Sequence, residues 1–135
     1  MSAADVFFDT NILLYLISSD GEKADRAERL LADGGHISIQ VLNEFAAVAR
    51  RKAGLAYDEI RDVLSTVREL TTLHALEAGT HDLALDIADK SGFHIYDSLI
   101  LASSQRAGCK VLYSEDLSAG QRIGDVLIVN PFSAP

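Results

Sequence analysis

Apolar and polar positions follow two kinds of pattern along this chain. Brief apolar runs rich in β-branched and aromatic residues, at residues 6–8, 36–39, 110–113 and 126–129, predict buried strands, with a further one near residues 73–75. Longer segments carry apolar residues three or four positions apart, which is typical of amphipathic helices. These segments are residues 22–32, 40–52, 58–70, 80–91 and 96–107. The order strand, helix, strand, several helices, strand, strand predicts an α/β domain with a central, mainly parallel β-sheet flanked by α-helices.

Polar residues predict where several of these elements begin. Thr10 is expected to cap a helix that runs to about Ser18, and Thr80 lies in a segment expected to cap a later helix. The chain has 135 residues and no linker rich in proline, glycine or serine, no repeat and no low-complexity run. We therefore expect residues 1–135 to form a single domain.

The apolar runs, the first residues and the single cysteine bear on where the protein is located in the cell. The longest apolar run, residues 12–17, is far shorter than the roughly 20 residues of a membrane span. Residues 1–5 carry no basic region of the kind that begins a secretion signal, so we expect a cytoplasmic protein with no membrane partner. Cys109 is the only cysteine, which excludes an intramolecular disulfide and a thiolate zinc cluster and favours a place in the core.

The charge balance constrains any interaction with nucleic acid. The chain has 12 Lys and Arg against 20 Asp and Glu, a formal net charge of -8. Acidic proteins do not attract nucleic acid by bulk electrostatics, so such a role requires bound cations or locally clustered basic residues. Residues 50–52, Arg-Arg-Lys, are one such cluster, although cations at the C-terminal end of a helix also stabilise that helix by themselves.

Four acidic residues fall at comparable points of the predicted units. Asp9 and Asp116 follow strands, Asp97 opens a helix, and Glu44 lies in the first turns of a helix that leaves a strand. Each has an ordinary structural explanation, as a helix cap, a turn residue or an exposed helical side chain. Together, however, all four are expected at one edge of the sheet. Because two charges about 4 Å apart repel by roughly 4 kcal/mol at an effective dielectric of 20, such a group must titrate or bind cations. Oxygen ligands alone favour Mg²⁺ or Mn²⁺.

The segments that carry these acids resemble a known family. They are Phe8-Asp9-Thr10-Asn11-Ile12-Leu13-Leu14-Tyr15, Ser38-Ile39-Gln40-Val41-Leu42-Asn43-Glu44-Phe45, Tyr96-Asp97-Ser98-Leu99-Ile100 and Leu112-Tyr113-Ser114-Glu115-Asp116-Leu117. In this order they look like the four motifs of PIN-domain nucleases. More narrowly, the chain resembles VapC toxins of VapBC toxin–antitoxin pairs, and the tail at residues 129–132 is similar to the end of that family. The segment from 51 to 90 matches only in helical character.

The resemblance implies a PIN-like fold and a metal-dependent endoribonuclease. Asp9, Glu44, Asp97 and Asp116 would be both the catalytic residues and the ligands of Mg²⁺ or Mn²⁺. Water activated by the metal would cleave RNA and leave a 5′-phosphate and a 3′-hydroxyl. A supporting polar set would orient the carboxylates by hydrogen bonds, although capping of helices and turns explains some of its members equally well. That set is Thr10, Asn11 and Ser114.

The resemblance also implies partners, namely a homodimer and a VapB-type antitoxin that lies across the toxin. We expect an apolar groove for it between the early helices, formed by Leu13, Leu16, Leu30 and Leu31, although a place in the core also explains the same residues. Glu115 is expected to point away from the acidic site. The four histidines are expected to be structural or surface residues, because metal-activated water needs no imidazole.

Other classes of function fit the residues less well. A receiver-like signalling module would need paired acids near the first strand and a lysine after a late strand, and a HAD-type phosphohydrolase would need an aspartate where Asn11 stands. A PIN domain that only binds RNA or protein remains an alternative. Loss of one acidic motif residue would favour that alternative, and none is lost.

Overall fold

The computed structural model describes residues 2–133 and is built on a six-stranded sheet. The strands are β1 (Val6–Phe8), β2 (His36–Ser38), β3 (Thr72–His74), β4 (Val111–Tyr113), β5 (Arg122–Ile123) and β6 (Val126–Val129). Their order across the sheet is β3-β2-β1-β4-β6-β5. All neighbouring strands are parallel except β5, which is antiparallel to β6. The predicted α/β class with a mainly parallel sheet is confirmed.

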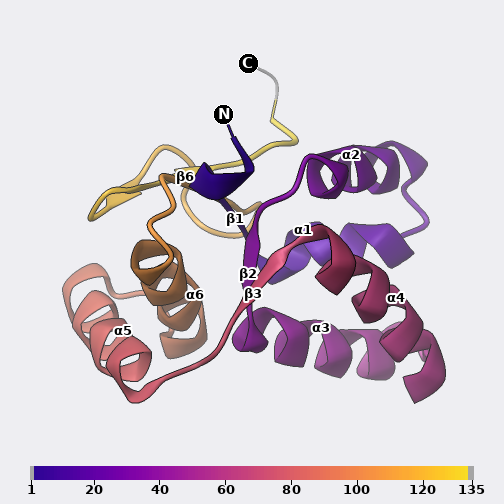
Figure 1. Cartoon of the computed structure of the whole chain (residues 1–135), viewed down its shortest axis with the longest axis horizontal. Helices are drawn as coiled ribbons and strands as arrows, with labels where there is room; N and C mark the ends of the chain where they lie inside the picture. The colour runs from indigo at the N-terminus through magenta and orange to yellow at the C-terminus, as the bar shows by residue number, and fades with distance from the viewer. Residues whose placement is uncertain (1, 134–135) are drawn as a thin grey trace.

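Helices cover both faces of this sheet (Figure 1). They are the 3₁₀ turns η1 (Ala3–Asp5) and η2 (Tyr15–Ile17) and the α-helices α1 (Thr10–Leu14), α2 (Gly21–Ala32), α3 (Ile39–Arg51), α4 (Tyr57–Leu70), α5 (Ala78–Ser91) and α6 (Ile95–Arg106). In Figure 1, α5 and α6 lie side by side on one side of the strands, and α1 to α4 lie on the other. Because both faces are covered, the central strands are continuous apolar runs without alternation.

The core is centred on β1, whose residues Phe7 and Phe8 are fully buried. Cys109 is also buried, as the sequence predicts. The approach to β2 is tight, since a Cβ atom on Gly35 would lie 2.5 Å from Cε2 of Phe8 and 3.0 Å from the carbonyl oxygen of Val6. Only a residue without a side chain therefore lets β2 pair beside β1 at this point.

Two details of the prediction are wrong, both of them helix caps. Asp9, not Thr10, caps α1, because the Asp9 carboxylate accepts a hydrogen bond from the Thr10 backbone N–H at 2.7 Å. The helical stretch that begins there reaches Ile17, close to the expected end at Ser18, but its last turn, η2, is a 3₁₀ turn. Glu77 is the N-cap of α5, and Thr80 is buried in its first turn, where its Oγ1 accepts a hydrogen bond from Arg106 Nη1 at 2.7 Å.

The short strand β5 has no counterpart in the prediction. It contains only two residues, and its strand conformation depends on pairing with β6, so the local pattern carries no signal for it. Of the helices in residues 2–133, none combines the length and apolar character that crossing a bilayer requires.

Candidate active site

Three of the four acidic residues singled out in the sequence follow the carboxyl ends of parallel strands, and the charge of the fourth, Asp97, acts on Asp9 from the start of a helix. Asp9 comes directly after β1, and its backbone N–H donates to the carbonyl oxygen of Tyr113 at 2.9 Å, so it stays beside the end of β4. Asp116 follows β4, Glu44 lies in the second turn of α3 just after β2, and Asp97 lies in the first turn of α6. In open parallel sheets this is the edge at which ligands bind.

Asp9 is the most buried of these acids, with 4% of its surface exposed. Its Oδ2 accepts a hydrogen bond from Ser114 Oγ at 2.7 Å and a longer one from Asn11 Nδ2 at 3.4 Å. Its Oδ1 accepts from the Thr10 N–H. The three residues of the predicted supporting set therefore lie around Asp9.

Burial controls the protonation of Asp9. Desolvation raises the pKa of its carboxyl from the ordinary 3.8 to about 7, against the opposing effect of the hydrogen bonds from Ser114 and Thr10. The nearby charges of Asp97 and Glu44 raise this pKa further. The fold thus holds a carboxyl group where its ionised form is disfavoured unless a positive charge comes close.

Glu44 is held by two polar contacts. Its Oε1 accepts a hydrogen bond from Thr10 Oγ1 at 3.2 Å, and its Oε2 accepts from Gln40 Nε2 at 2.9 Å. Gln40 lies one turn before Glu44 on α3 and is itself buried. Gln40 was not among the residues predicted for the site, although its spacing of four residues from Glu44 on a helix is a signal in the sequence that could have identified it.

Asp97 interacts electrostatically with both the buried Asp9 and the exposed Asp116. Partial burial raises the pKa of Asp97, the charge of Asp116 raises it further, and His94 opposes both effects. His94 is exposed and caps α6, with its Nδ1 accepting from the Tyr96 N–H at 3.1 Å. Electrostatic effects therefore link Asp9 to Glu44 and to Asp97, and Asp97 to Asp116, although these residues lie far apart in the sequence.

A known family matches most of this chain, including the four acids and the elements that carry them. The PIN domain profile matches residues 6–121, which contain all four acidic positions. The chain belongs to the PIN domain family. No curated protein matches the sequence significantly.

Solved structures share the fold of this PIN domain. A toxin–antitoxin complex from Klebsiella pneumoniae has a TM-score of 0.73 at 19% identity and covers 96% of this chain and 100% of that one. VapC20 of Mycobacterium tuberculosis, a sarcin-ricin loop cleaving toxin, has a TM-score of 0.67 at 19% identity, with coverages of 83% and 90%. VapBC2 from Rickettsia felis, bound to a promoter DNA fragment, has a TM-score of 0.67 at 18% identity, with coverages of 91% and 96%. At these identities the likeness concerns the fold.

The donor set of this PIN domain is compatible with a divalent cation. Its acidic oxygens are the ligands that Mg²⁺ and Mn²⁺ prefer, and their mutual repulsion would be relieved by a positive ion. Within residues 2–133, no three acidic, histidine or cysteine side chains lie close enough together to form a ready-made ligand cluster. The fit therefore rests on donor type and on charge.

A further polar cluster beside the acids was not predicted from the sequence. Glu115 points away from the acids, as expected, and accepts hydrogen bonds from Lys23 and Tyr15. The bond from Lys23, followed by that from Tyr15, lowers the pKa of the Glu115 carboxyl. These residues are 92 and 100 positions away from Glu115 in the sequence, so no local spacing connects them.

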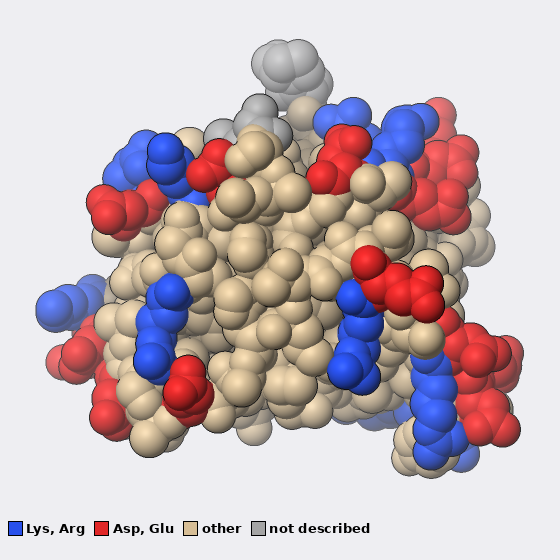
Figure 2. Space-filling model, in the orientation of Figure 1, with Lys and Arg blue, Asp and Glu red and all other residues tan. Residues whose placement is uncertain are grey.

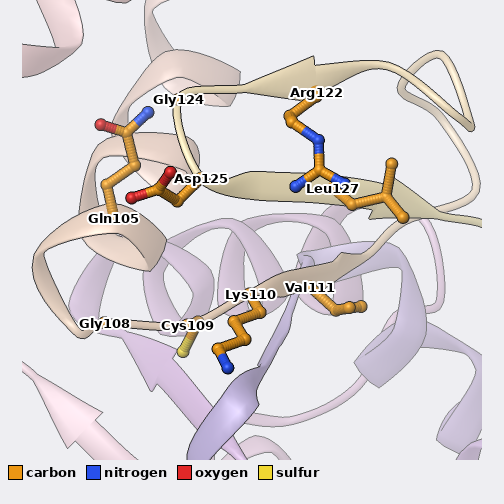
Figure 3. Close-up of a pocket in the computed structure, with 9 residues that line it drawn as sticks. All are labelled: Gln105, Gly108, Cys109, Lys110, Val111, Arg122, Gly124, Asp125 and Leu127. Carbon is orange, nitrogen blue, oxygen red and sulfur yellow. The ribbon is translucent and has the colours of Figure 1, made fainter.

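A cavity of about 690 Å³ lies elsewhere, at the amino ends of β4 and β6 (Figure 3). Lys110, Val111, Arg122 and Leu127 line it, and Asp125 is the only acidic residue in its wall. Because the strands are parallel, this cavity is at the edge of the sheet opposite the four acids. The size of a cavity therefore does not by itself indicate where the acidic site lies.

Proposed function

We propose that residues 1–135 form a single PIN domain that acts as a metal-dependent endoribonuclease, the toxin of a VapBC-type toxin–antitoxin pair. The observation that carries the proposal is Asp9, a buried carboxyl group with a pKa of about 7 among other acids at the carboxyl edge of the sheet. Perturbed carboxyl groups of this kind cluster at functional sites. The fold shared with toxin–antitoxin structures supports the assignment.

Each residue has a role in this proposal. Asp9, Glu44, Asp97 and Asp116 would hold Mg²⁺ or Mn²⁺. A cation bound there would lower the pKa of a water molecule and neutralise charge on the scissile phosphate. The supporting residues fix the carboxylates: Thr10 Oγ1 donates to Glu44, and Ser114 Oγ donates to Asp9. Asn11 Nδ2 contacts both Asp9 and Ser114 Oγ, each at 3.4 Å.

RNA binding in this proposal depends on local cations. Figure 2 shows basic and acidic side chains interleaved around the rim of one face, with an uncharged centre, so this face has no continuous basic surface. With a net charge of -8, the protein gains no bulk attraction for RNA. A bound metal ion at the acids would supply positive charge at the point where the phosphate must sit.

The proposed antitoxin would occupy an apolar groove of about 290 Å³ between η2, α2 and α4. Leu16 and Leu31 of the expected set line it, together with Val67 and the exposed Leu70 of α4. Leu13 is fully buried in the core and is not part of the groove, so the core alternative holds for this residue. Leu30, also expected there, packs on the core and does not line this cavity.

A Leu70→Glu variant tests this groove. It would place a charge in an apolar contact, and we expect it to weaken copurification with a coexpressed VapB-type antitoxin without loss of the fold. Copurification equal to that of the wild type would move the binding site elsewhere. Sedimentation at micromolar concentration tests the proposed homodimer, and a clean monomer would refute it.

The decisive experiment is cleavage of defined RNAs by the wild type and by Asp97→Asn, purified identically. We expect cleavage that requires Mg²⁺ or Mn²⁺, stops in EDTA and leaves 5′-phosphate ends, because the acids would hold the metal that activates water. The variant should lose at least about a hundredfold in rate, which separates the enzyme from a contaminating ribonuclease.

The competing interpretation is a PIN domain that binds RNA or protein without cleaving it. Equal behaviour of the wild type and Asp97→Asn on every RNA, together with thermal stabilisation by metal, would favour that interpretation. The presence of all four acidic motif residues argues against that interpretation.

A further inference from the structure

Lys23, Tyr15, Glu115 and Phe132 form a compact group beside the four acids, which we call the Lys23 cluster. Lys23 Nζ donates to Glu115 Oε2 at 2.8 Å and to the Tyr15 hydroxyl at 3.0 Å, and the Tyr15 hydroxyl donates to Glu115 Oε1. The two aromatic rings meet edge to face at 4.8 Å. Lys23 Nζ lies 4.8 Å from the centroid of Tyr15 and 5.5 Å from that of Phe132. The ammonium group of Lys23 thus has a carboxylate, a hydroxyl and two aromatic rings around it.

The cluster joins segments that are distant in the sequence. Tyr15 lies in η2, Lys23 in the first turns of α2, Glu115 in the loop after β4, and Phe132 in the segment after β6. Both loops leave the carboxyl edge of the sheet, where the proposed active site lies. The cluster therefore fixes α2 against the same edge.

The loop of residues 114–117 carries Asp116 and is held on one side by Asp9, which directly follows β1. Ser114 Oγ donates to Asp9 Oδ2 at 2.7 Å and accepts from the Leu117 N–H at 3.2 Å. Among the described residues, the Asp116 carboxylate accepts no hydrogen bond. The position of Asp116 therefore depends on how firmly its neighbours in the loop are held.

Glu115 holds the loop at two points. Its backbone N–H donates to Asn11 Oδ1 at 3.1 Å, which ties it to α1. Its side chain ties the loop to α2 through Lys23 and to η2 through Tyr15. Removing the side-chain contacts would leave the loop attached through Asp9, Asn11 and the backbone hydrogen bond from Ser114 N–H to the Val129 carbonyl oxygen at 3.0 Å, with no contact to α2 or η2 from Glu115.

The ion pair between Lys23 and Glu115 is too exposed to contribute much to the stability of the whole protein. The side chains of Lys23 and Glu115 are 35% and 26% exposed. Ion pairs near the surface contribute little to the free energy of unfolding. Loss of the pair should therefore loosen the loop while the protein stays folded.

We propose that Lys23 and Glu115 are positioning residues that hold the 114–117 loop, and with it Asp116, in the geometry needed for hydrolysis of RNA. The catalytic part of this inference rests on the proposed ribonuclease function. Neither residue is expected to touch the reacting phosphate. They act through the loop, and Tyr15 completes the set of hydrogen bonds that orients them.

The test uses Lys23→Met and Glu115→Gln, singly and together, on the full chain. Arg61→Met is the matched control, because it also breaks an ion pair of 2.8 Å, here with Asp58 on the exposed surface of α4. Steady-state cleavage gives kcat and KM, chemical denaturation gives stability, and amide hydrogen exchange at Glu115 and Leu117 reports on the loop.

We expect Lys23→Met to lower kcat about tenfold with KM changed less than about twofold. The reason is that the substitution displaces Asp116, which is proposed to act in the transition state and not in RNA binding. Exchange at both amides should accelerate. Because the two residues act as a unit, the double variant should be no slower than the worse single variant. Lys23→Arg, which keeps the charge, should recover most of kcat, and Arg61→Met should behave as the wild type.

Three results would overturn the inference. Unchanged exchange at Glu115 and Leu117 in Lys23→Met would show that the cluster does not hold the loop. A rise in KM alone would make Lys23 an RNA contact. A wild type that cleaves no RNA would refute the proposed function and the catalytic part of this inference with it, whereas the exchange measurement would still decide whether the cluster holds the loop.

Discussion

Asp9→Asn is the substitution whose effect can be worked out most fully from the structure. In the folded protein the pKa of Asp9 is raised from 3.8 to about 7, chiefly by burial. The folded state therefore favours the protonated form, so the stability from this group is fully present below pH 3.8 and is lost as pH rises through about 7. At about 1.36 kcal/mol per pKa unit, the ionised Asp9 destabilises the metal-free fold by about 4 kcal/mol.

An asparagine at position 9 removes that charge and keeps a side chain of nearly the same size. Part of the gain is lost, because its amide cannot reproduce both acceptor contacts of the carboxylate with Thr10 and Ser114. A weakened hydrogen bond costs about 1–2 kcal/mol. We therefore expect Asp9→Asn to be about 2–3 kcal/mol more stable than the wild type at about pH 8 and to show no gain at about pH 5.

Urea denaturation in EDTA at the two pH values measures this difference. Asp116→Asn, a substitution of an exposed side chain, is the control. It should change the free energy of unfolding by less than about 0.5 kcal/mol. Added Mn²⁺ should stabilise the wild type and not Asp9→Asn, because the ion would compensate the charge that the variant lacks. A variant no more stable than the wild type at the higher pH, or a gain independent of pH, would refute the electrostatic account of Asp9.

Two further predictions concern the sheet away from the acids. His74 Nε2 lies 2.8 Å from His36 Nδ1, and burial followed by the charge of His36 lowers the pKa of His74, so stability should fall as pH drops through the unfolded-state value of about 6.5. His74→Phe should reduce this acid-induced fall in Tm, and an equal fall in both proteins would contradict the role of the pair. Gly35→Ala would place a methyl group 2.5 Å from the Phe8 ring and should destabilise the fold by about 1–3 kcal/mol at any pH, measurable by urea denaturation. A stability equal to that of the wild type would show that β1 and β2 can separate without cost.

The local pattern of the sequence determined most of the fold. Buried parallel strands must be apolar throughout and helices must present an apolar stripe, so Val6–Phe8 and Val126–Val129 and the larger helices could be read directly. The sequence also identified the acids that follow strand ends, because parallel strands bring their carboxyl ends to one edge. The local pattern did not predict features that depend on neighbours in space. β5 forms only by pairing with β6, and Asp9 replaces Thr10 as the cap of α1.

Tertiary structure alone decided how the acids differ. Asp9 and Asp116 both follow strands in the sequence, yet Asp9 is enclosed beneath Thr10 and Ser114 and Asp116 is exposed. Desolvation by burial, not residue type, gives Asp9 its raised pKa. Likewise, nothing near Glu115 in the sequence indicates Lys23, because the two meet only when α2 packs beside the loop after β4. Charge and hydrogen-bonding capacity are written in the sequence, whereas burial and long-range pairing arise only when the chain has folded.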